Sequence, residues 1–348
     1  MRRKSKKIYV GKIAVGGDSP ITVQSMTNTK TADVSKTVDQ INRLTDLGCE
    51  IIRVAVPDFE SAERLSEIRR MIKIPLIADI HFDYRLALEA IRQGVDGLRL
   101  NPGNIRQADK VKEIVLRAKE AGIPIRIGVN SGSIEKSLLE KYGGPTAEGM
   151  VESALKHVHI LESNDFDDIV ISLKSTDIMM TVKAYELMAE KVDYPFHVGI
   201  TEAGTVWTGT IKSAVGLGIL LSRGYGDTIR VSLTGDPAEE VRVGWQILKS
   251  LGIRKRGIEI ISCPTCGRTE IDLVGLAEKV EKLFSNLDKD ITIAVMGCVV
   301  NGPGEAREAD IGITGGKGAG LIFRKGKIIK KIPEENLISE LEKEIEKI

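Results

Sequence analysis

The stretch EIIRVAVPDFESAERLSEIRRMIKIPLIADIH, residues 50–81, predicts one strand–helix–strand unit. Residues 50–57 and 75–81 are short runs rich in Ile, Val and Leu, and the segment between them carries its apolar residues at helical spacing. Apolar runs without strict alternation are typical of parallel strands that are buried on both faces. The unit therefore predicts two parallel strands joined by a helical crossover.

The same unit recurs along the first two thirds of the chain. Eight apolar strands are predicted to begin at Ile21, Glu50, Pro75, Gly97, Pro124, Asp168, Pro195 and Asp227. The segments between them are amphipathic; in the first of them, for example, Val38, Ile41 and Leu44 share one helix face. Eight such units predict an α/β protein with a (β/α)8 TIM barrel. A doubly wound open sheet is the alternative, but no G-x-G-x-x-G motif follows the first strand.

The character of the sequence changes after the run RKRG, residues 254–257. Two further strands, IEIISC at residues 258–263 and ITIAVMGC at residues 291–298, each end in a cysteine. A helical segment lies between them, and glycine-rich turns, a hairpin and a charged helix follow. The sequence therefore predicts a barrel domain with its exit helix over residues 1–256 and a small α+β domain over residues 257–348.

The charge balance argues against several classes of partner. The chain has 50 basic and 49 acidic residues, a net charge of +1, whereas binding to nucleic acid or to an anionic membrane needs a surplus of Lys and Arg. No run is apolar and long enough to span a bilayer, and the basic start, residues 1–17, lacks the apolar stretch of a signal peptide. Four cysteines are too few for a disulfide framework. We expect a cytoplasmic protein whose basic start is exposed to solvent.

In a TIM barrel the chemistry takes place at the carboxyl ends of the strands, and here those ends carry many cations. The polar residues at these positions are Arg53, Asp79, His81, Arg99, Asn101, Arg126, Asn130, Lys174, Glu202, Arg230 and Ser232. Buried guanidinium groups are costly unless an anion pairs with them, and their planar shape suits phosphate oxygens. The set predicts a pocket for a diphosphate or a similar polyanion. Alternatively, each cation pairs with an acid on a neighbouring helix or lies in solvent.

The cysteines indicate a metal centre in the second domain. Cys263 and Cys266 form a C-x2-C pair, and Cys298 ends the next strand. All four histidines lie in the barrel, so the chief local candidate for a fourth ligand is Glu305. Three thiolates and a carboxylate form a poor closed zinc site but suit an iron–sulfur cluster with one exchangeable iron. A zinc site and a dithiol redox pair are the alternatives, and Cys49 is expected to be a buried apolar residue.

These motifs resemble a known family. The segments QSMTNT, IIRVAVP, DIHF, GLRLNPGN, RIGVN, SLKSTD, GITEAG, SCPTCGR and MGCVVNGPGEA are similar, in consistent order, to those of the bacterial-type 4-hydroxy-3-methylbut-2-enyl diphosphate synthases. The resemblance runs from Ile8 to the end of the chain. It implies a TIM barrel joined to a sulfite-reductase-like module that carries a 4Fe–4S cluster.

The resemblance also implies a reaction and the residues that perform it. The family converts 2-C-methyl-D-erythritol 2,4-cyclodiphosphate to 4-hydroxy-3-methylbut-2-enyl diphosphate by reduction with loss of water, in the methylerythritol phosphate pathway to isoprenoid precursors. By resemblance, the substrate would be bound by Arg53, Arg99, Asn101, Arg126, Asn130, Lys174, Arg230 and Ser232. The cluster ligands would be Cys263, Cys266, Cys298 and Glu305. The catalytic residues would be Asp79, His81, Glu202 and Glu305, with Glu202 as a proton donor.

The resemblance implies partners as well. Ferredoxin or flavodoxin would supply the electrons, and a head-to-tail homodimer would bring each barrel to the cluster domain of the other chain. Closure within one chain, by a hinge near residues 251–257, is the alternative to the dimer. The rival to the whole interpretation is a pteridine-type transferase barrel with a zinc-stabilised C-terminal module.

Overall fold

The computed structural model describes residues 2–101, 104–105, 107–284, 287, 289–298, 304, 306–316 and 318–348. The chain divides into two compact units, Met1–Arg254 and Lys255–Ile348. None of the described helices is long and apolar enough to cross a membrane.

The first unit is built around an eight-stranded parallel sheet. Its strands are β3 (Thr22–Met26), β4 (Ile51–Ala55), β5 (Leu76–Asp79), β6 (Gly97–Leu100), β7 (Ile125–Asn130), β8 (Ile169–Lys174), β9 (His197–Val198) and β10 (Thr228–Ile229). The order in the sheet is β8-β7-β6-β5-β4-β3-β10-β9, and a parallel bridge between Ile171 and Phe196 joins its two ends. The bridge closes the sheet, and the predicted TIM barrel is confirmed.

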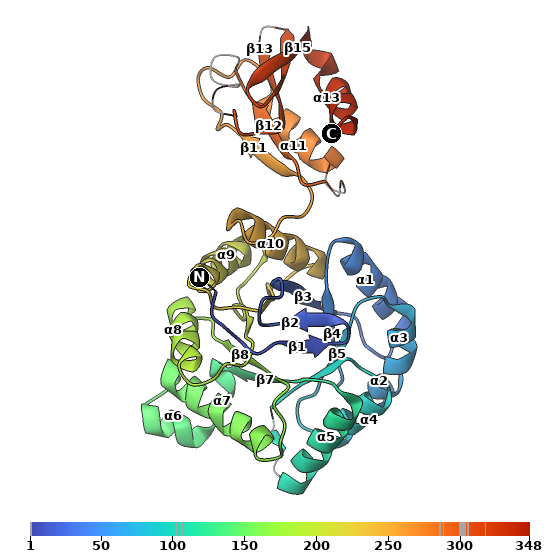
Figure 1. The fold of residues 1–348 in the computed structure, drawn as a ribbon, viewed down its shortest axis with the longest axis vertical. Helices are drawn as coiled ribbons and strands as arrows, with labels where there is room; N and C mark the ends of the chain where they lie inside the picture. The colour runs from blue at the N-terminus through green and yellow to red at the C-terminus, as the bar shows by residue number, and fades with distance from the viewer. Residues whose placement is uncertain are drawn as a thin grey trace. The chain divides into compact units, whose positions relative to one another are not determined.

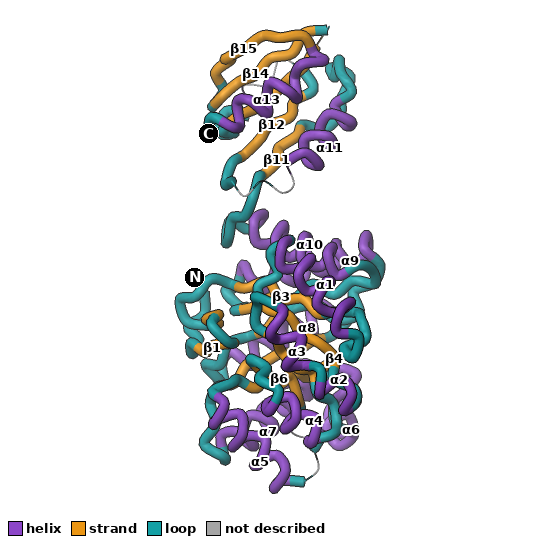
Figure 2. Tube along the Cα trace, turned by 90° about the vertical axis from the view of Figure 1, so that its right-hand side faces the viewer, coloured by secondary structure: helices purple, strands orange, loops and turns teal. Residues whose placement is uncertain are grey.

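Helices surround this sheet on its outer side (Figure 1, Figure 2). They are α1 (Val34–Asp46), α2 (Phe59–Glu63), α3 (Leu65–Met71), α4 (Tyr84–Arg92), α5 (Ala108–Ala121), α6 (Lys136–Tyr142), α7 (Ala147–Glu162), α8 (Ile178–Ala189), α9 (Val206–Ser222) and α10 (Pro237–Ser250), with a 3-10 turn, η2 (Ser131–Ser133), after β7. The helices bury apolar stripes, as α1 does with Val38, Ile41 and Leu44. The side chain of Asp33 caps α1 by accepting a hydrogen bond from the backbone N–H of Lys36.

A hairpin that the sequence analysis missed covers one end of the barrel. β1 (Ile8–Val10) and β2 (Ile13–Val15) pair antiparallel and cross the end of the barrel that faces the viewer in Figure 1. Apolar side chains of this hairpin pack against Ile51, Ile77 and Val170, which lie in the first halves of their strands. The hairpin therefore closes the amino end of the barrel.

The basic residues before the hairpin also lie on the barrel, so the prediction of a solvent-exposed start is wrong. Arg2 forms an ion pair of 2.5 Å with the buried carboxylate of Asp227. The guanidinium of Arg3 lies 3.9 Å from the ring centroid of Phe196 and donates a hydrogen bond of 3.2 Å to the carbonyl of Val192. These contacts hold the start of the chain against β9, β10 and the loops that precede them.

The second unit contains a five-stranded sheet with helices packed against it. Its strands, in sheet order, are β11 (Glu259–Ser262), β12 (Thr292–Met296), β13 (Ile311–Gly316), β14 (Ala319–Arg324) and β15 (Lys327–Pro333), and its helices are α11 (Leu273–Phe284) and α13 (Leu337–Glu346), with a 3-10 turn, η3 (Glu334–Asn336). β11, β12 and β13 are parallel, whereas β14 and β15 continue the sheet antiparallel. Val280, Ile293 and Leu341 are fully buried between the layers. The unit has the α+β architecture that the sequence predicts.

Candidate active site

The carboxyl ends of the barrel strands surround a pocket of about 170 Å³. It is lined by Met26, Arg53, Asp79, His81, Arg99, Arg126, Gly128, Asn130, Ser172, Lys174, Thr201, Arg230 and Ser232. The predicted barrel residues therefore converge on one pocket, except for Asn101 and Glu202. Five cations and, among the described lining residues, a single carboxylate face this pocket.

That carboxylate belongs to Asp79, at the end of β5, and it pairs with cations on both neighbouring strands. It lies 3.6 Å from Nε of Arg53 and 3.3 Å from Nη1 of Arg99. Nε2 of His81 lies 3.7 Å from the same carboxylate. Burial alone would raise the pKa of Asp79, but the charge of Arg53, the hydrogen bond with His81 and the charge of Arg99 hold it well below its usual range. Asp79 is therefore an anion at neutral pH that fixes two cations of the pocket.

The thioether of Met26 lies between two other donors of the pocket. Nη2 and Nε of Arg53 approach its Sδ to 2.9 and 3.2 Å, and Nη1 of Arg230 approaches it to 3.8 Å. Burial lowers the pKa of Arg53 to about 10, against the opposing effect of Asp79. Arg53 therefore keeps its charge at neutral pH, although it is largely withdrawn from solvent.

Arg126 and Lys174 differ from Arg53 and Arg99 because no carboxylate of the described residues pairs with them. Their exposed fractions are 4% and 8%, and neither forms an ion pair with an Asp or Glu of the described chain. Nη1 of Arg126 donates to Oε1 of Gln24 over 2.5 Å, while its Nη2 has no partner among the described groups. Burial, reinforced by the surrounding cations, lowers the pKa of both groups well below their usual values. Buried cations of this kind are stabilised by an anionic ligand.

The carboxylate that pairs with Arg230 comes from a helix and is absent from the predicted set. Oε1 of Glu240, on α10, lies 3.5 Å from Nη2 of Arg230. The same carboxylate accepts hydrogen bonds from Oγ of Ser25 at 3.0 Å and from the backbone N–H of Leu233 at 3.1 Å. Glu240 lies on the buried face of α10, one turn before Gly244. A charged residue on an otherwise apolar helix face was the signal that could have revealed it.

Two glycines make room for the cations. A Cβ atom on Gly128 would lie 2.8 Å from Nε of Arg99, and a Cβ atom on Gly199 would lie 3.0 Å from Nζ of Lys174. Real Cβ atoms almost never approach other heavy atoms as closely as the first of these distances. The position of Arg99 therefore depends on the missing side chain of Gly128, whereas a Cβ atom on Gly199 would meet the backbone carbonyl oxygen of Arg230 before Lys174.

Asn101 and Glu202 lie beside the pocket rather than in its wall. Oδ1 of the buried Asn101 accepts a hydrogen bond of 3.0 Å from the backbone N–H of Gly128, so its side chain supports β7. Glu202 follows the lining residue Thr201, and its own side chain is exposed. Its φ of 51° lies in the left-handed region, which residues other than glycine rarely occupy. Such backbone strain is typical of functional loops.

In the second unit, the predicted cysteine ligands lie at the ends of adjacent strands. Cys263 follows β11 directly, and Cys298 lies two residues after the end of β12, which pairs with β11 in parallel. The backbone N–H of Gly297 donates a hydrogen bond of 3.2 Å to Sγ of Cys263. Hydrogen bonds from Arg268, first from its backbone, lower the pKa of the exposed Cys266 thiol. These three thiols have the chemistry and the accessibility of cluster ligands.

The fourth predicted ligand, Glu305, lies outside the described residues, as do residues 299–303. Within the part of the chain that the structure describes, no three His, Cys, Asp or Glu side chains are grouped as a metal site.

Cys49 is 2% exposed in the barrel core, where burial raises its pKa to about 12, as expected of a structural thiol.

Fold and pocket together define a TIM-barrel protein with five cations at the carboxyl ends of its strands. The sequence model of the GcpE TIM-barrel domain matches residues 5–245, and that of the GcpE protein C-terminal domain matches residues 259–347. The chain therefore belongs to the GcpE family. A protein of Geobacter sulfurreducens named 4-hydroxy-3-methylbut-2-en-1-yl diphosphate synthase (flavodoxin) is 61% identical over 348 residues, which cover 100% of this chain and 99% of that protein.

Other relatives carry the same name. The protein of Ruminiclostridium cellulolyticum is 62% identical over 344 residues, which cover 99% of this chain and 98% of that protein. The family resemblance inferred from the motifs is confirmed, and with it the assignment of the chain as an oxidoreductase of isoprenoid precursor biosynthesis.

Solved structures with similar coordinates show the fold alone. The N-acetylneuraminic acid synthetase of Leptospira borgpetersenii has a TM-score of 0.51 at 13% identity, covering 81% of this chain and 98% of its own. The dihydropteroate synthase of Stenotrophomonas maltophilia has a TM-score of 0.50 at 14% identity, covering 71% of this chain and 99% of its own. A pteridine-type transferase is therefore not favoured, because full-length relatives of about 60% identity are named as diphosphate synthases.

Proposed function

We propose that the barrel pocket binds 2-C-methyl-D-erythritol 2,4-cyclodiphosphate, which the protein reduces to 4-hydroxy-3-methylbut-2-enyl diphosphate with loss of water. The observation that carries this proposal is the pair Arg126 and Lys174, two buried cations without a carboxylate partner among the described residues. A diphosphate supplies the anionic oxygens that such groups need. The cyclic diphosphate thus matches both the charge of the pocket and the family of the chain.

The cations divide into two groups with different tasks. Arg53 and Arg99 are fixed by Asp79 before any ligand binds, so they are preorganised toward the pocket. Arg126 and Lys174 gain a counter-charge only when the diphosphate arrives. Arg230, Ser232 and Asn130 complete the proposed binding set, and Asn101 is proposed to act indirectly, by supporting β7 at Gly128. When the ring opens, the same cations stabilise the charge that develops on the departing diphosphate oxygen.

Two further residues are proposed to move protons. Glu202 lies at the pocket mouth beside Thr201, and its exposed carboxyl can exchange protons with solvent. His81 is half exposed and lies against Asp79, which would orient its ring. Asp79 itself is held in its ionised form and is therefore a positioning group for the cations and for His81 rather than a proton donor.

We further propose that Cys263, Cys266, Cys298 and Glu305 hold a 4Fe–4S cluster. The three thiols fit this role because two of them follow neighbouring parallel strands and the third has a lowered pKa. When bound, such a cluster would supply electrons one at a time and one exchangeable coordination position. The names of the relatives support flavodoxin as the electron donor, with ferredoxin as the second candidate, in a cytoplasmic protein.

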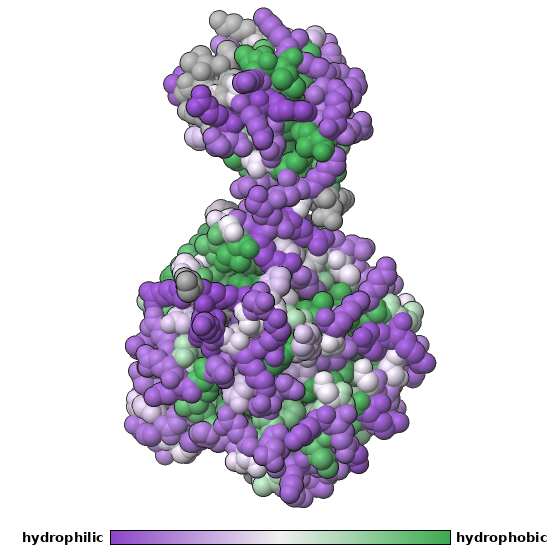
Figure 3. Space-filling model, viewed as in Figure 1, coloured by the Kyte–Doolittle hydropathy of each residue, from purple (hydrophilic) through white to green (hydrophobic). Residues whose placement is uncertain are grey.

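A head-to-tail homodimer is the arrangement we propose for bringing a barrel and a cluster together. Its support is an apolar strip on the outside of α9, visible as the green area over this helix in Figure 3. Val206, Trp207, Ile211 and Val215 are 40%, 76%, 48% and 47% exposed there. Exposed apolar residues at helical spacing are typical of a surface that another protein covers.

The reaction is tested with protein purified without oxygen, supplied with the cyclic diphosphate and reduced flavodoxin. We expect the linear diphosphate to form at a rate that depends on protein concentration. Binding of the cyclic diphosphate without product would contradict the reaction, and a failure to bind it would contradict the pocket assignment. Mixing Cys266→Ser with Arg126→Met protein tests the dimer, because activity can return only if one chain's barrel meets another chain's cluster.

A further inference from the structure

β3 presents two uncharged hydrogen-bond acceptors to the interior of the barrel. Gln24 and Met26 are two residues apart, so their side chains leave the strand on the same face, whereas Ser25 between them faces outward and donates to Glu240 of α10. Gln24 is 2% exposed, and Met26 lines the barrel pocket. Among the described lining residues of this pocket, Met26 alone has an apolar side chain. Its place among five cations needs a physical reason.

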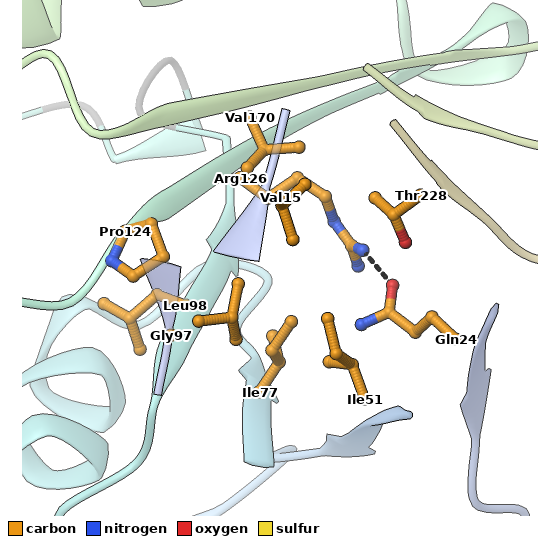
Figure 4. A pocket seen from close by; sticks show the side chains of 11 residues that line it. Val15, Gln24, Ile51, Ile77, Gly97, Leu98, Pro124, Arg126, Val170 and Thr228 are labelled. Atoms are coloured by element: carbon orange, nitrogen blue, oxygen red, sulfur yellow. Dashed lines mark hydrogen bonds between the residues drawn. The ribbon is translucent and has the colours of Figure 1, made fainter. Parts of the chain in front are cut away.

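Gln24 holds Arg126 from the opposite side of the barrel. Three other strands separate β3 from β7, which carries Arg126, in either direction around the closed sheet. Nη1 of Arg126 donates to Oε1 of Gln24 over 2.5 Å, and Figure 4 draws this bond as a dashed line between the two side chains. A guanidinium group has donors only, so the amide turns its oxygen toward Arg126. The contact fixes the buried guanidinium but adds no counter-charge to it.

Met26 does the same for two guanidinium groups on the neighbouring strands. It pairs with Arg53 in the register of β3 and β4, and Arg230 follows β10 on the other side of β3. Sδ of Met26 is therefore a common contact of Nε and Nη2 of Arg53 and, at a longer distance, of Nη1 of Arg230. A thioether is polarisable and accepts hydrogen bonds weakly, without adding a charge.

The common alternatives to these two acceptors would each remove part of this arrangement. A leucine at either position would leave largely buried N–H groups without an acceptor. A carboxylate would neutralise a cation before the substrate arrives, as Asp79 and Glu240 already do in part for Arg53 and Arg230. It would also repel the phosphate oxygens of the substrate.

We propose that Gln24 and Met26 are positioning residues of the barrel pocket, which hold three guanidinium groups in place without neutralising them. This inference rests on the proposed diphosphate ligand of the pocket. The diphosphate then meets cations that are already oriented and still carry the charge that binds it. β3 thus gives up a more stable ligand-free barrel, which carboxylates would provide, for tighter binding of the anion.

The role of Gln24 is tested by Gln24→Glu, for which stability and binding should change in opposite directions. The new carboxylate pairs with the buried Arg126, so the unfolding temperature of the ligand-free variant should rise. The same carboxylate competes with the ligand, so calorimetry should show at least tenfold weaker binding of inorganic diphosphate. Gln246→Glu, at an exposed position of α10, is the control for the added charge and should change neither quantity. Native affinity in Gln24→Glu, or a loss of affinity together with a loss of stability, would overturn this role.

The role of Met26 is tested by removing the acceptor and then restoring it. Met26→Leu keeps the approximate shape and should unfold near the native temperature, but it should bind inorganic diphosphate about tenfold more weakly. Met26→Gln supplies an uncharged amide oxygen and should return the affinity to within about threefold of the native value. Met150→Leu, fully buried in α7, is the control for the exchange itself. Native affinity in Met26→Leu, or no recovery in Met26→Gln, would overturn this role.

The same measurements separate this inference from the proposed function. If the native protein does not bind inorganic diphosphate, the pocket assignment fails and the positioning roles fail with it. If the native protein and all the variants bind it equally, only the positioning roles fail. If the variants behave as expected but the cyclic diphosphate is not reduced, the positioning roles stand and the proposed reaction is wrong.

Discussion

The carboxylate of Glu240 lies 3.5 Å from the guanidinium of Arg230, so a helix of the outer layer holds a cation of the pocket. Because Ser25 and the backbone of Leu233 donate to the same carboxylate, Glu240 links β3, α10 and the segment after β10. The orientation of Arg230 is therefore set from outside the pocket.

Replacement Glu240→Gln removes the charge while keeping the shape of the side chain. We expect kcat/KM for the cyclic diphosphate to fall by about 10²-fold, because the guanidinium of Arg230 is no longer held in its orientation by an ion pair. The unfolding temperature should also fall, since a largely buried cation loses its partner.

The matched control is Glu239→Gln, on the preceding and more exposed position of α10, where the side chain pairs with Arg242. This variant should keep native kinetics. If both substitutions lowered kcat/KM equally, the loss would come from the net charge of α10 and not from the contact between Glu240 and Arg230.

Gly128→Ala should displace Arg99. The added methyl group would lie 2.8 Å from Nε of Arg99, so the guanidinium must move away from β7 and disturb its hydrogen bond of 3.1 Å to the carbonyl of Gly128. We expect a loss of about 1–3 kcal/mol in the free energy of unfolding by urea, with weaker binding of the diphosphate by calorimetry. Gly132→Ala, where nothing lies within 4 Å of the new atom, should change neither quantity; binding that is unaltered in Gly128→Ala would refute the steric argument.

Lys174→Met should separate stability from binding. A buried ammonium group without a carboxylate partner in the described chain destabilises the ligand-free barrel. We therefore expect the variant to unfold at a higher urea concentration and to bind the cyclic diphosphate at least tenfold more weakly. Lys183→Met, at an exposed position of α8, is the control for the loss of a positive charge. A Lys174→Met protein with native affinity would remove this residue from the binding set.

Substitutions of Cys266 and Cys49 should differ in their effect on the iron and sulfide content. Cys266→Ser should lose most of the iron and acid-labile sulfide of protein purified without oxygen, because a hydroxyl replaces an exposed thiol of lowered pKa. Cys49→Ala, in the barrel core, should retain both elements in full. Metal analysis decides the question, and undiminished iron in Cys266→Ser would exclude this residue as a ligand.

The strip on α9 predicts the state of association. Ile211→Lys places a charge in the middle of this apolar surface, and we expect it to convert dimers into monomers in sedimentation experiments. Leu116→Lys, at a similarly exposed position of α5, should remain dimeric. A native protein that sediments as a monomer at all concentrations would contradict the proposed dimer.

The barrel is predictable from the sequence because its strands are short apolar runs that alternate regularly with amphipathic helical segments. The cations of the pocket are also predictable, since alternate residues of a barrel strand point inward and the strand ends meet at one mouth. The β1–β2 hairpin escapes prediction because each strand has three residues and follows a highly basic segment. Glu240 escapes because its partners Arg230 and Ser25 are 10 and 215 residues away along the chain.

The β8–β9 junction, at the bridge between Ile171 and Phe196, has a much shorter backbone ladder than the β7–β8 junction. β7 and β8 pair along six residue positions, whereas β8 and β9 are joined by this bridge and by the hydrogen bond from the N–H of Ile171 to the carbonyl of Pro195. The buried hydroxyl of Tyr185 adds a link, because it accepts from the N–H of Leu173 at 2.9 Å and donates to the carbonyl of His197 at 2.7 Å. Because the β8–β9 backbone ladder is the shorter of the two, amide hydrogen exchange should be faster at Ile171 than at Ile127 on the neighbouring strand. The closure of the barrel between β8 and β9 therefore depends in part on one phenol group, that of Tyr185.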